Sequence, residues 1–263
     1  MNEAQSGLAI VGPGLIGTSV GLAAKRRWPE LDVRTIDKGE PLEKIDDAAV
    51  VILAAPVDAI LAMLPSLARV LSKQALVIDT GSTKRAIMVA AAMAGLRQFV
   101  GGHPMAGGTV SGAAGARADL FDGRTWFLTN PDAPDAVRRA VKFVEALGAK
   151  PVILGDHGEE HDRLMAALSH LPQVTASMLM AVVTRVVGEN GLQWAGNGLR
   201  DTTRLAASRP EMWQSILATN REELKPLIKY FASELSSFAD RLEDPDAVRA
   251  LFEEAARAKS SCL

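Results

Sequence analysis

Short apolar segments alternate with longer segments of helical spacing over the first 154 residues. Apolar runs at residues 8–11, 48–55 and 75–79 are typical of strands that are buried on both faces of a parallel sheet. Apolar positions three and four residues apart then predict helices, for example from Pro56 to about Leu71. This alternation of strand and helix predicts an α/β domain with a doubly wound, mostly parallel sheet.

From residue 155 onward the pattern changes to helices alone. We expect one long helix from about Glu159 to Val187, with a kink or break at Pro172 because proline has no backbone N–H to donate. Further helices are expected at about residues 210–242 and 245–259. The long helix carries apolar side chains around most of its circumference, so it needs a partner that covers it. The second domain is therefore expected to be all-helical and to form a homodimer.

Length, charge and cysteine content narrow the class of protein. A chain of 263 residues is long enough for two domains, which we place at residues 1–154 and 155–263. The formal net charge of -2 gives no reason to expect a nucleic-acid partner. The single cysteine, Cys262, excludes a disulfide framework. The sequence shows neither a secretory signal nor an uninterrupted apolar stretch of membrane length, so we expect a cytoplasmic protein with no membrane partner.

A glycine-rich segment lies between the first predicted strand and the helix that follows it. Residues 12–17 read Gly-Pro-Gly-Leu-Ile-Gly, and an acid, Asp37, ends the next predicted strand. Glycines at this spacing allow a tight turn and let a pyrophosphate approach the N-terminus of the helix. The motif and the acid together predict a dinucleotide site. The residues predicted to form it are Gly12, Gly14, Leu15, Ile16, Gly17 and Asp37.

Asp37 also indicates which dinucleotide is bound. Its carboxylate can accept hydrogen bonds from the ribose hydroxyls and would repel a 2′-phosphate, which favours NAD as the cofactor. Lys38 and Arg34 lie close in sequence and would weaken that repulsion. NADP therefore stays open as the alternative cofactor.

His103 and Ser82 follow two neighbouring predicted strands, whose carboxyl ends meet at one edge of a sheet. Flanking glycines let a ligand approach His103 closely, and imidazole can accept a proton near neutral pH. We predict that His103 is the catalytic base of an alcohol-oxidising dehydrogenase; the alternative is a histidine that stabilises a turn. Ser82 either orients the imidazole by a hydrogen bond or caps the next helix. Lys84 is expected to be a surface or cofactor-side charge.

Two polar segments interrupt the apolar pattern of the helical half. His170 lies in a Ser-His-Leu-Pro segment, and Arg200 and Arg204 lie four residues apart in a glycine-flanked segment. Arginines at this spacing share one helix face, and a guanidinium group can bind a carboxylate through two hydrogen bonds. We predict that both arginines bind a substrate carboxylate; the alternative for Arg204 is an ion pair within its own helix. Trp213 is expected in the core.

His157 and His161 are spaced as two metal ligands on one helix face would be. The sequence offers no evident third ligand, and their position at the domain boundary favours the exposed, polar start of a helix. We therefore predict no metal site.

Taken in order, these motifs resemble those of the prephenate/arogenate (cyclohexadienyl) dehydrogenase family of tyrosine biosynthesis. The matching segments span nearly the whole chain and lie at residues 12–17, 81–84, 102–107, 169–172 and 198–204. The resemblance implies an N-terminal Rossmann domain, a C-terminal helical dimerisation domain and an active site between them. It also implies that His103 is the catalytic histidine, that Ser82 is its hydrogen-bonding partner, and that His170 and Arg200 bind the substrate.

The activity that the resemblance implies is an NAD(P)-dependent oxidative decarboxylation of prephenate, arogenate or both, giving 4-hydroxyphenylpyruvate or tyrosine. His103 would take the proton of the ring hydroxyl, and activity would rise with pH near ~6.5 unless the site shifts the imidazole pKa. Thr109 stands where many family members have an acid that would pair with the ammonium group of arogenate, which favours prephenate. Two alternatives stay open: another two-domain dehydrogenase of the β-hydroxyacid type, and a dinucleotide-binding protein without activity.

Overall fold

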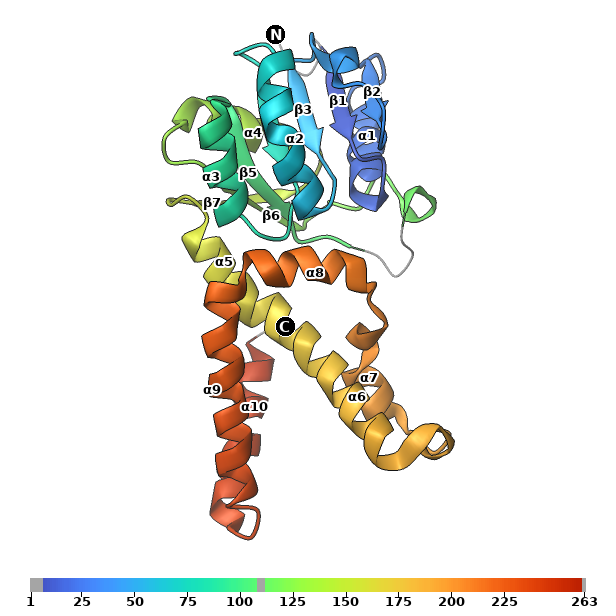
Figure 1. Ribbon diagram of the computed structural model, residues 1–263, viewed down its shortest axis with the longest axis vertical. Coiled ribbons are helices and arrows are strands. Elements are labelled where there is room, and N and C mark those ends of the chain that lie inside the picture. Colours follow the sequence, from blue (N-terminus) through green and yellow to red (C-terminus); the bar gives the residue numbers. More distant parts are fainter. Residues whose placement is uncertain (1–6, 108–111, 262–263) are drawn as a thin grey trace.

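The computed structural model describes residues 7–107 and 112–261. The chain forms an α/β half followed by a helical half (Figure 1). A seven-stranded sheet lies in the first half, and within the described residues the second half consists of helices and connecting loops. This arrangement confirms the predicted α/β domain followed by an all-helical one.

Short and largely apolar strands build the sheet. Every residue of the three central strands β1, β3 and β4 is buried, because both faces of the sheet are covered. The order in the sheet is β2-β1-β3-β4-β5-β6-β7, and all neighbouring strands are parallel except β5 and β6. The strands are β1 (Leu8–Val11), β2 (Val33–Ile36), β3 (Val50–Leu53), β4 (Leu76–Asp79), β5 (Phe99–Pro104), β6 (Thr125–Thr129) and β7 (Lys150–Leu154).

Helices cover both faces of the sheet, as the doubly wound prediction requires. Helices α1 and α4 pack with one apolar cluster, and α2 and α3 pack with another on the opposite face. These helices are α1 (Leu15–Arg27), α2 (Val57–Val70), α3 (Arg85–Ala94) and α4 (Pro134–Ala146). The connection from β2 to β3 contains a 3-10 turn, η2 (Leu42–Ile45). In the sheet, β1 lies between β2 and β3, and the strand order reverses at this point. Ligands of open α/β sheets bind at such a point.

The helical half begins with a run that changes geometry twice. A π-helical turn, η4 (Ala166–His170), ends just before Pro172, where the sequence predicted a kink or break. Helical backbone angles in the following helix are interrupted at Gly188, which has φ of +67°, directly after the predicted end at Val187, and a short helical piece follows this kink. Helices and turns in this half are α5 (Glu159–Met165), η4, α6 (Leu171–Leu192), α7 (Asn197–Thr202), η5 (Arg204–Ala207), α8 (Pro210–Thr219), α9 (Arg221–Ala239) and α10 (Pro245–Ser260).

The predicted single helix over residues 210–242 is two helices. Asn220 separates α8 from α9, with φ of -110° and ψ of 21°, and its amide is occupied by contacts with α5 and η4. Helix α8 consequently lies across the base of the α/β half, while α9 runs away from it (Figure 1). The break places the start of α9 beside the junction of the two halves.

Much of the helical half exposes apolar side chains. Val186 on α6 is 78% exposed and Phe252 on α10 is 68% exposed, and α6 and α9 diverge below α8 (Figure 1). The helical run from Glu159 to Leu192 is also long and apolar enough to cross a membrane, judged by length and composition alone.

Candidate active site

The glycine loop after β1 has the geometry of a pyrophosphate site. Gly12 has φ of +95°, and a Cβ there would lie 2.5 Å from the carbonyl oxygen of Ala54; a Cβ at Gly17 would lie 2.2 Å from that of Gly12. Gly14 differs, because a Cβ there would meet no atom within 4 Å. Helix α1 begins after Gly14 with no side chain capping its N-terminus. Its first N–H groups are therefore free for an anion that approaches over Gly14.

Asp37 lies at the end of β2, next to this loop. The N–H of Gly12 donates to the carbonyl oxygen of Ile36 at 2.9 Å, and the exposed Asp37 carboxylate accepts the N–H of Lys38 at 2.7 Å. Arg34, which we expected to soften the repulsion of a 2′-phosphate, is instead paired with Asp47 at 2.6 Å. The arrangement strengthens the preference for NAD, because this guanidinium is already engaged.

His103 lies near the end of β5, where two glycines precede it. A Cβ at Gly102 would lie 2.4 Å from the carbonyl oxygen of Asp79, and one at Gly101 would lie 2.8 Å from Sδ of Met88. Side chains at these positions would push β5 away from β4 and α3. The glycines therefore let β5 pack closely enough to bring the partly buried His103 to the end of the sheet.

The partner of His103 is a second histidine that comes from the helical half. Nδ1 of His103 lies 2.9 Å from Nε2 of His161, and Nδ1 of His161 lies 2.9 Å from Oδ1 of Asp162. The prediction that His161 is part of an exposed helix start is wrong, because its side chain is 0% exposed. His157 lies apart from it, exposed and paired with Asp132. Among the described residues, no group of three His, Cys, Asp or Glu side chains is placed to hold a metal ion.

The burial of His161 and Asp162 has a signal in the sequence. They share a helix face with Met165 and Ala166, which are also buried. Polar residues on the apolar stripe of a helix are buried when the helix packs, and they then need polar partners. A histidine and an aspartate on such a stripe predict a buried polar contact with another part of the chain.

Ser82 does not make the contact that we predicted. It is partly buried in the segment between β4 and α3, but the hydrogen-bonding partner of Nδ1 of His103 is Nε2 of His161. The alternative as a helix cap is also wrong, since the residue before α3 is Lys84 and no side chain of that residue caps the helix. A catalytic contribution of Ser82 stays a prediction.

Lys84 is a buried ion-pair partner and not the surface charge that we expected. Its side chain is 1% exposed, and Nζ pairs with Oδ2 of Asp79, which is 0% exposed. Asp79 also accepts the N–H of Gly81 at 2.8 Å and of Gly102 at 3.0 Å. Burial raises the pKa of Asp79 and lowers that of Lys84, and the pairing opposes both shifts. Asp79 thus ties the backbone that follows β4, at Gly81, to the backbone just before His103, at Gly102.

His103 is a neutral imidazole at neutral pH. Its pKa is well below the usual value of 6.5, first because of burial and then because of His161, Lys84 and His170 nearby. A neutral ring retains a lone pair, so it can accept a proton from a bound hydroxyl group.

His170 lies buried at the end of the π turn, and one of its two ring nitrogens has a hydrogen-bonding partner. Nδ1 lies 3.0 Å from Nδ2 of Asn220, and the ring stands edge-on to Trp213 with 5.9 Å between centroids. Burial lowers the pKa of His170 to about 4. Nε2 of His170 and Nε1 of Trp213 are both buried without a hydrogen-bond partner among the described residues. Trp213 packs against the core as predicted, and it also brings an unpaired N–H beside His170.

Arg200 and Arg204 do not share a helix face. Helix α7 ends at Thr202, and Arg204 begins the separate turn η5. The hydroxyl groups of Thr202 and Thr203 donate hydrogen bonds to carbonyl oxygens four residues earlier. Such a contact bends helices. Both arginines are exposed, and neither has an ion-pair partner within the described part of the chain.

The turn that begins with Arg204 is bonded to the start of α6. The carbonyl oxygen of the next residue, Leu205, accepts a hydrogen bond of 2.8 Å from the amide nitrogen Nε2 of Gln173. Gln173 lies three residues after His170. Arg200 has no such tie to this region among the hydrogen bonds of the described residues. Of the two arginines, Arg204 is therefore the one whose turn is bonded to α6 shortly after His170.

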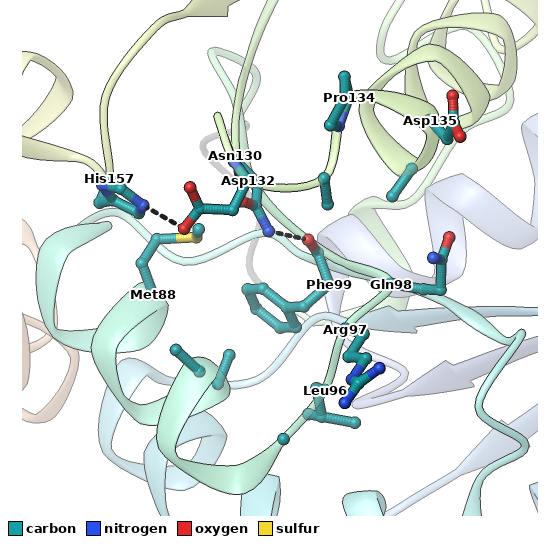
Figure 2. Close-up of a pocket in the computed structure, with 15 residues that line it drawn as sticks. Met88, Leu96, Arg97, Gln98, Phe99, Asn130, Asp132, Pro134, Asp135 and His157 are labelled. Atoms are coloured by element: carbon teal, nitrogen blue, oxygen red, sulfur yellow. Dashed lines mark hydrogen bonds and ion pairs between the residues drawn. The ribbon is translucent and has the colours of Figure 1, made fainter.

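A cavity of about 600 Å³ lies elsewhere, between the end of α3, the start of β5 and the start of α4. Figure 2 shows Met88 and Phe99 on one side of it, and His157 directed toward Asp132 on another. None of the residues predicted for the active site lines this cavity. This cavity is therefore separate from the cluster of His103, His161 and Asp162.

Two family models match the chain in succession. The model described as prephenate dehydrogenase, nucleotide-binding domain, matches residues 16–153, and that described as prephenate dehydrogenase, dimerization domain, matches residues 157–254. The prephenate dehydrogenase of Bacillus subtilis strain 168 is 32% identical over 94% of this chain and 73% of its own length. The cyclohexadienyl dehydrogenase of Zymomonas mobilis is 29% identical over 96% of this chain and 94% of its own.

A solved structure shares the fold of the whole chain. The crystal structure of prephenate dehydrogenase from A. aeolicus, in complex with hydroxyphenyl propionate and NAD+, has a TM-score of 0.89. It is 23% identical in sequence and covers 97% of this chain and 98% of its own. At this identity the likeness concerns the fold.

Proposed function

The chain belongs to the prephenate dehydrogenase family and is an oxidoreductase, and we propose that it oxidises and decarboxylates prephenate with NAD, using His103 as proton acceptor. The observation that carries this proposal is the position of His103. A neutral imidazole, held by a second imidazole, lies at the end of a strand in a sheet whose glycine loop fits a pyrophosphate. A neutral imidazole beside a cofactor site is suited to accept a proton from a bound substrate.

His103 would handle one proton in the reaction. As hydride leaves ring carbon C4 of prephenate, the imidazole takes the proton of the hydroxyl on that carbon, so a carbonyl forms. The bond between the ring and its carboxylate then breaks, CO2 departs, and the electron pair makes the ring aromatic. The phenolate oxygen takes back the proton that His103 holds. The products are 4-hydroxyphenylpyruvate, CO2 and the reduced cofactor, with all atoms and electrons accounted for.

The glycine loop and Asp37 would hold the dinucleotide. The N–H groups at the start of α1 would bind the pyrophosphate over Gly14, where no side chain intervenes. Asp37 would bind the adenosine ribose through its hydroxyls. When bound, the nicotinamide supplies the hydride acceptor. With Arg34 engaged by Asp47, we propose NAD as the preferred cofactor over NADP.

The carboxylates of prephenate would be bound from the helical half. Arg204 has an exposed guanidinium on a turn fixed by Gln173, and His170 has an unpaired ring nitrogen in the same region. A guanidinium group and a neutral N–H both bind a carboxylate oxygen. Arg200 would assist from α7. Thr109, on which the preference for prephenate over arogenate depends, lies outside the described residues, so that preference stays a prediction.

The exposed apolar face of the helical half would be covered by a second copy of the chain. Residues 157–254 match a dimerization domain, and Val186 and Val187 on α6 are exposed. Burial of such a face is favourable by roughly 25 cal/mol per Å² of apolar surface. We propose a homodimer in the cytoplasm and not a membrane span, because Arg185 and Glu189 interrupt the apolar part of α6. Sedimentation of the purified chain should give twice the monomer mass, and Val186→Glu should give the monomer. Recovery of the chain only with lipid or detergent would contradict a soluble dimer.

A spectrophotometric assay of the purified protein tests the activity. Prephenate and arogenate are offered separately, each with NAD and with NADP, and the reduced cofactor is followed at roughly 340 nm, where the reduced nicotinamide absorbs. Reduction of NAD with prephenate, accompanied by 4-hydroxyphenylpyruvate, is the expected result. If a protein that binds NAD reduces it with neither substrate, the proposal fails. A β-hydroxyacid dehydrogenase would then be the next hypothesis.

A further inference from the structure

A line of hydrogen bonds connects His103 to the helical half through two residues that have no part in the reaction as described above. Nδ1 of His103 faces Nε2 of His161, and Nδ1 of His161 faces Oδ1 of Asp162, each at 2.9 Å. The side chains of His161 and Asp162 are 0% and 1% exposed. The three side chains form one buried sequence of donors and acceptors that ends at the active site.

The carboxylate sets the direction of these hydrogen bonds. Oδ1 of Asp162 also accepts the N–H of Lys84 at 2.7 Å, and Oδ2 accepts the N–H of Arg85 at 3.0 Å. A neutral imidazole carries a single N–H, so that of His161 is on Nδ1, where Asp162 accepts it. Nε2 of His161 is then an acceptor, and the N–H that it receives is on Nδ1 of His103. The lone pair of His103 is therefore left on Nε2.

We propose that His161 and Asp162 are positioning residues that hold His103 in the tautomer whose Nε2 accepts a proton. The identity of that proton rests on the proposed function, whereas the tautomer rests on the hydrogen bonds alone. Because burial and nearby groups lower the pKa of His103, the neutral ring is the form present at neutral pH. A neutral imidazole in the opposite tautomer would present an N–H to the substrate hydroxyl and could not accept its proton.

Asp162 also ties this tautomer to the docking of the two halves. The N–H groups that it accepts stand at the start of α3, which has no side-chain cap of its own. Gly158 makes the approach possible, since it has φ of +108° and a Cβ there would lie 2.6 Å from Cβ of Lys84. One carboxylate thus caps a helix of the α/β half and orients His161. The base is oriented only when the helical half is docked.

The surroundings of His103 contain few other ionisable groups. The titratable and charged side chains that act on it or on its partner belong to the β4–α3 segment, α5 and the π turn, and they are Asp79, Lys84, His161, Asp162 and His170. The ammonium group of Lys84 is paired with Asp79, so it does not donate a hydrogen bond to Nε2 of His161 in place of His103. Asp162 is consequently the acceptor that sets the His161 ring.

His170 provides an internal comparison, because its tautomer should be the opposite one. Nδ2 of Asn220 donates to the carbonyl oxygen of Asp162 at 2.8 Å, which fixes the amide, and the same nitrogen lies 3.0 Å from Nδ1 of His170. Nδ1 of His170 is then an acceptor, so its N–H is on Nε2. The site would contain one histidine that accepts a proton and one that donates a hydrogen bond.

The tautomers can be measured by NMR of the 15N-labelled full chain without substrate. The chain has 4 histidines, and His103→Asn and His170→Asn identify the two signals. At about pH 8, where the rings are neutral, we expect N–H on Nδ1 for His103 and on Nε2 for His170. An N–H on Nε2 of His103 in the wild-type protein would overturn the proposal. If the protein lacks prephenate activity but shows the expected tautomers, the proposed function fails and the tautomer assignment stands.

Two substitutions of His161 separate positioning from packing. His161→Phe fills the space without an acceptor, so His103 should populate both tautomers and kcat should fall at least about tenfold across the pH profile. The KM for prephenate and the Kd for NAD should stay unchanged. His161→Gln restores an acceptor on a flexible side chain and should recover part of kcat and of the wild-type tautomer. Wild-type kcat and an unchanged tautomer in His161→Phe would overturn the proposal; if that variant does not fold, the wild-type spectrum decides.

Discussion

The α/β half and the helical half bury different kinds of side chain. In the first half, apolar residues fill both faces of the sheet. In the second half, the buried side chains include as many polar residues as apolar ones, and the polar ones are His161, Asp162, His170, Gln173, Thr203 and Asn220. Few of its large apolar side chains are fully buried, and many are exposed. The α/β half has an extensive apolar core, which also takes in Ile216 of α8, whereas the helical half buries little apolar surface and, we propose, depends on a second copy.

This difference bears on the active site that we propose at the junction of the two halves. A sheet with both faces covered offers its strand ends for ligands, and β5 presents His103 there. Two of the polar residues that the helical half buries, His161 and Asp162, meet this end of the sheet, and Asn220 holds Asp162 and His170 together behind them. In the function that we propose, one half supplies the cofactor site and the base, and the other supplies the groups that orient the base and bind substrate.

The largest effect is expected for His103→Asn. Loss of a positioned proton acceptor should lower kcat by about 100-fold or more, while the Kd for NAD stays near the wild-type value because the glycine loop is untouched. Steady-state kinetics and NAD titration measure the two quantities. A kcat close to wild type would show that the α/β half does not supply the base.

The sequence predicted the α/β half well because its signals are local. Apolar runs, the glycine spacing and the Gly-Gly-His segment each determine their own structure through neighbours in sequence and in the sheet. Lys84 was misjudged for the opposite reason. Its burial depends on Asp79, which accepts it only after β5 packs beside β4, and no local pattern reports that.

The helical half was harder to predict because its polar residues act at a distance. His161 pairs with His103, which is 58 residues earlier in the chain, so spacing within one helix could not reveal the contact. The prediction that Arg200 and Arg204 share one helix face was wrong for a different reason. Thr203 ends the helical geometry between Arg200 and Arg204, and the segment contains no proline that would announce a break.

The next largest effect is expected for Arg204→Ala, compared with Arg200→Ala. Loss of a charged hydrogen bond to a carboxylate costs about 1.5–3 kcal/mol, so the KM for prephenate should rise about 10- to 100-fold in Arg204→Ala with little change in kcat. Arg200→Ala should have the smaller effect, because the turn with Arg204 is the one fixed next to the π turn. The reverse order would assign substrate binding to α7 and weaken the connection with His170.

A smaller effect is expected in the α/β half for Gly14→Ala, with Gly17→Ala as its matched comparison. Gly14 has open space around its Cβ position, so the alanine variant should keep the wild-type Tm while the Kd for NAD rises about tenfold. Gly17→Ala places a methyl group against backbone and should lower the free energy of unfolding by about 1–3 kcal/mol. Thermal melts and NAD titration of both variants separate the two roles. Unchanged NAD affinity in Gly14→Ala would move the pyrophosphate away from this loop.

The smallest expected effect is a displacement of the acid limb of the pH profile. The base must be neutral, and the pKa of His103 lies well below 6.5, first because of burial and then because of His161, Lys84 and His170. The value of kcat/KM should therefore stay level as the pH falls through 6.5 and decrease only below it, in contrast to the rise near that pH expected of an unperturbed imidazole. Unfolded histidines take up protons near ~6.5 whereas these folded ones do not, so stability should also fall as the pH drops below that value. Thermal melts at each pH keep the kinetics within the folded range. An acid limb at or above 6.5 in folded protein would show that the junction leaves the base exposed to water, and the two halves would then be less tightly joined than their buried polar contacts indicate.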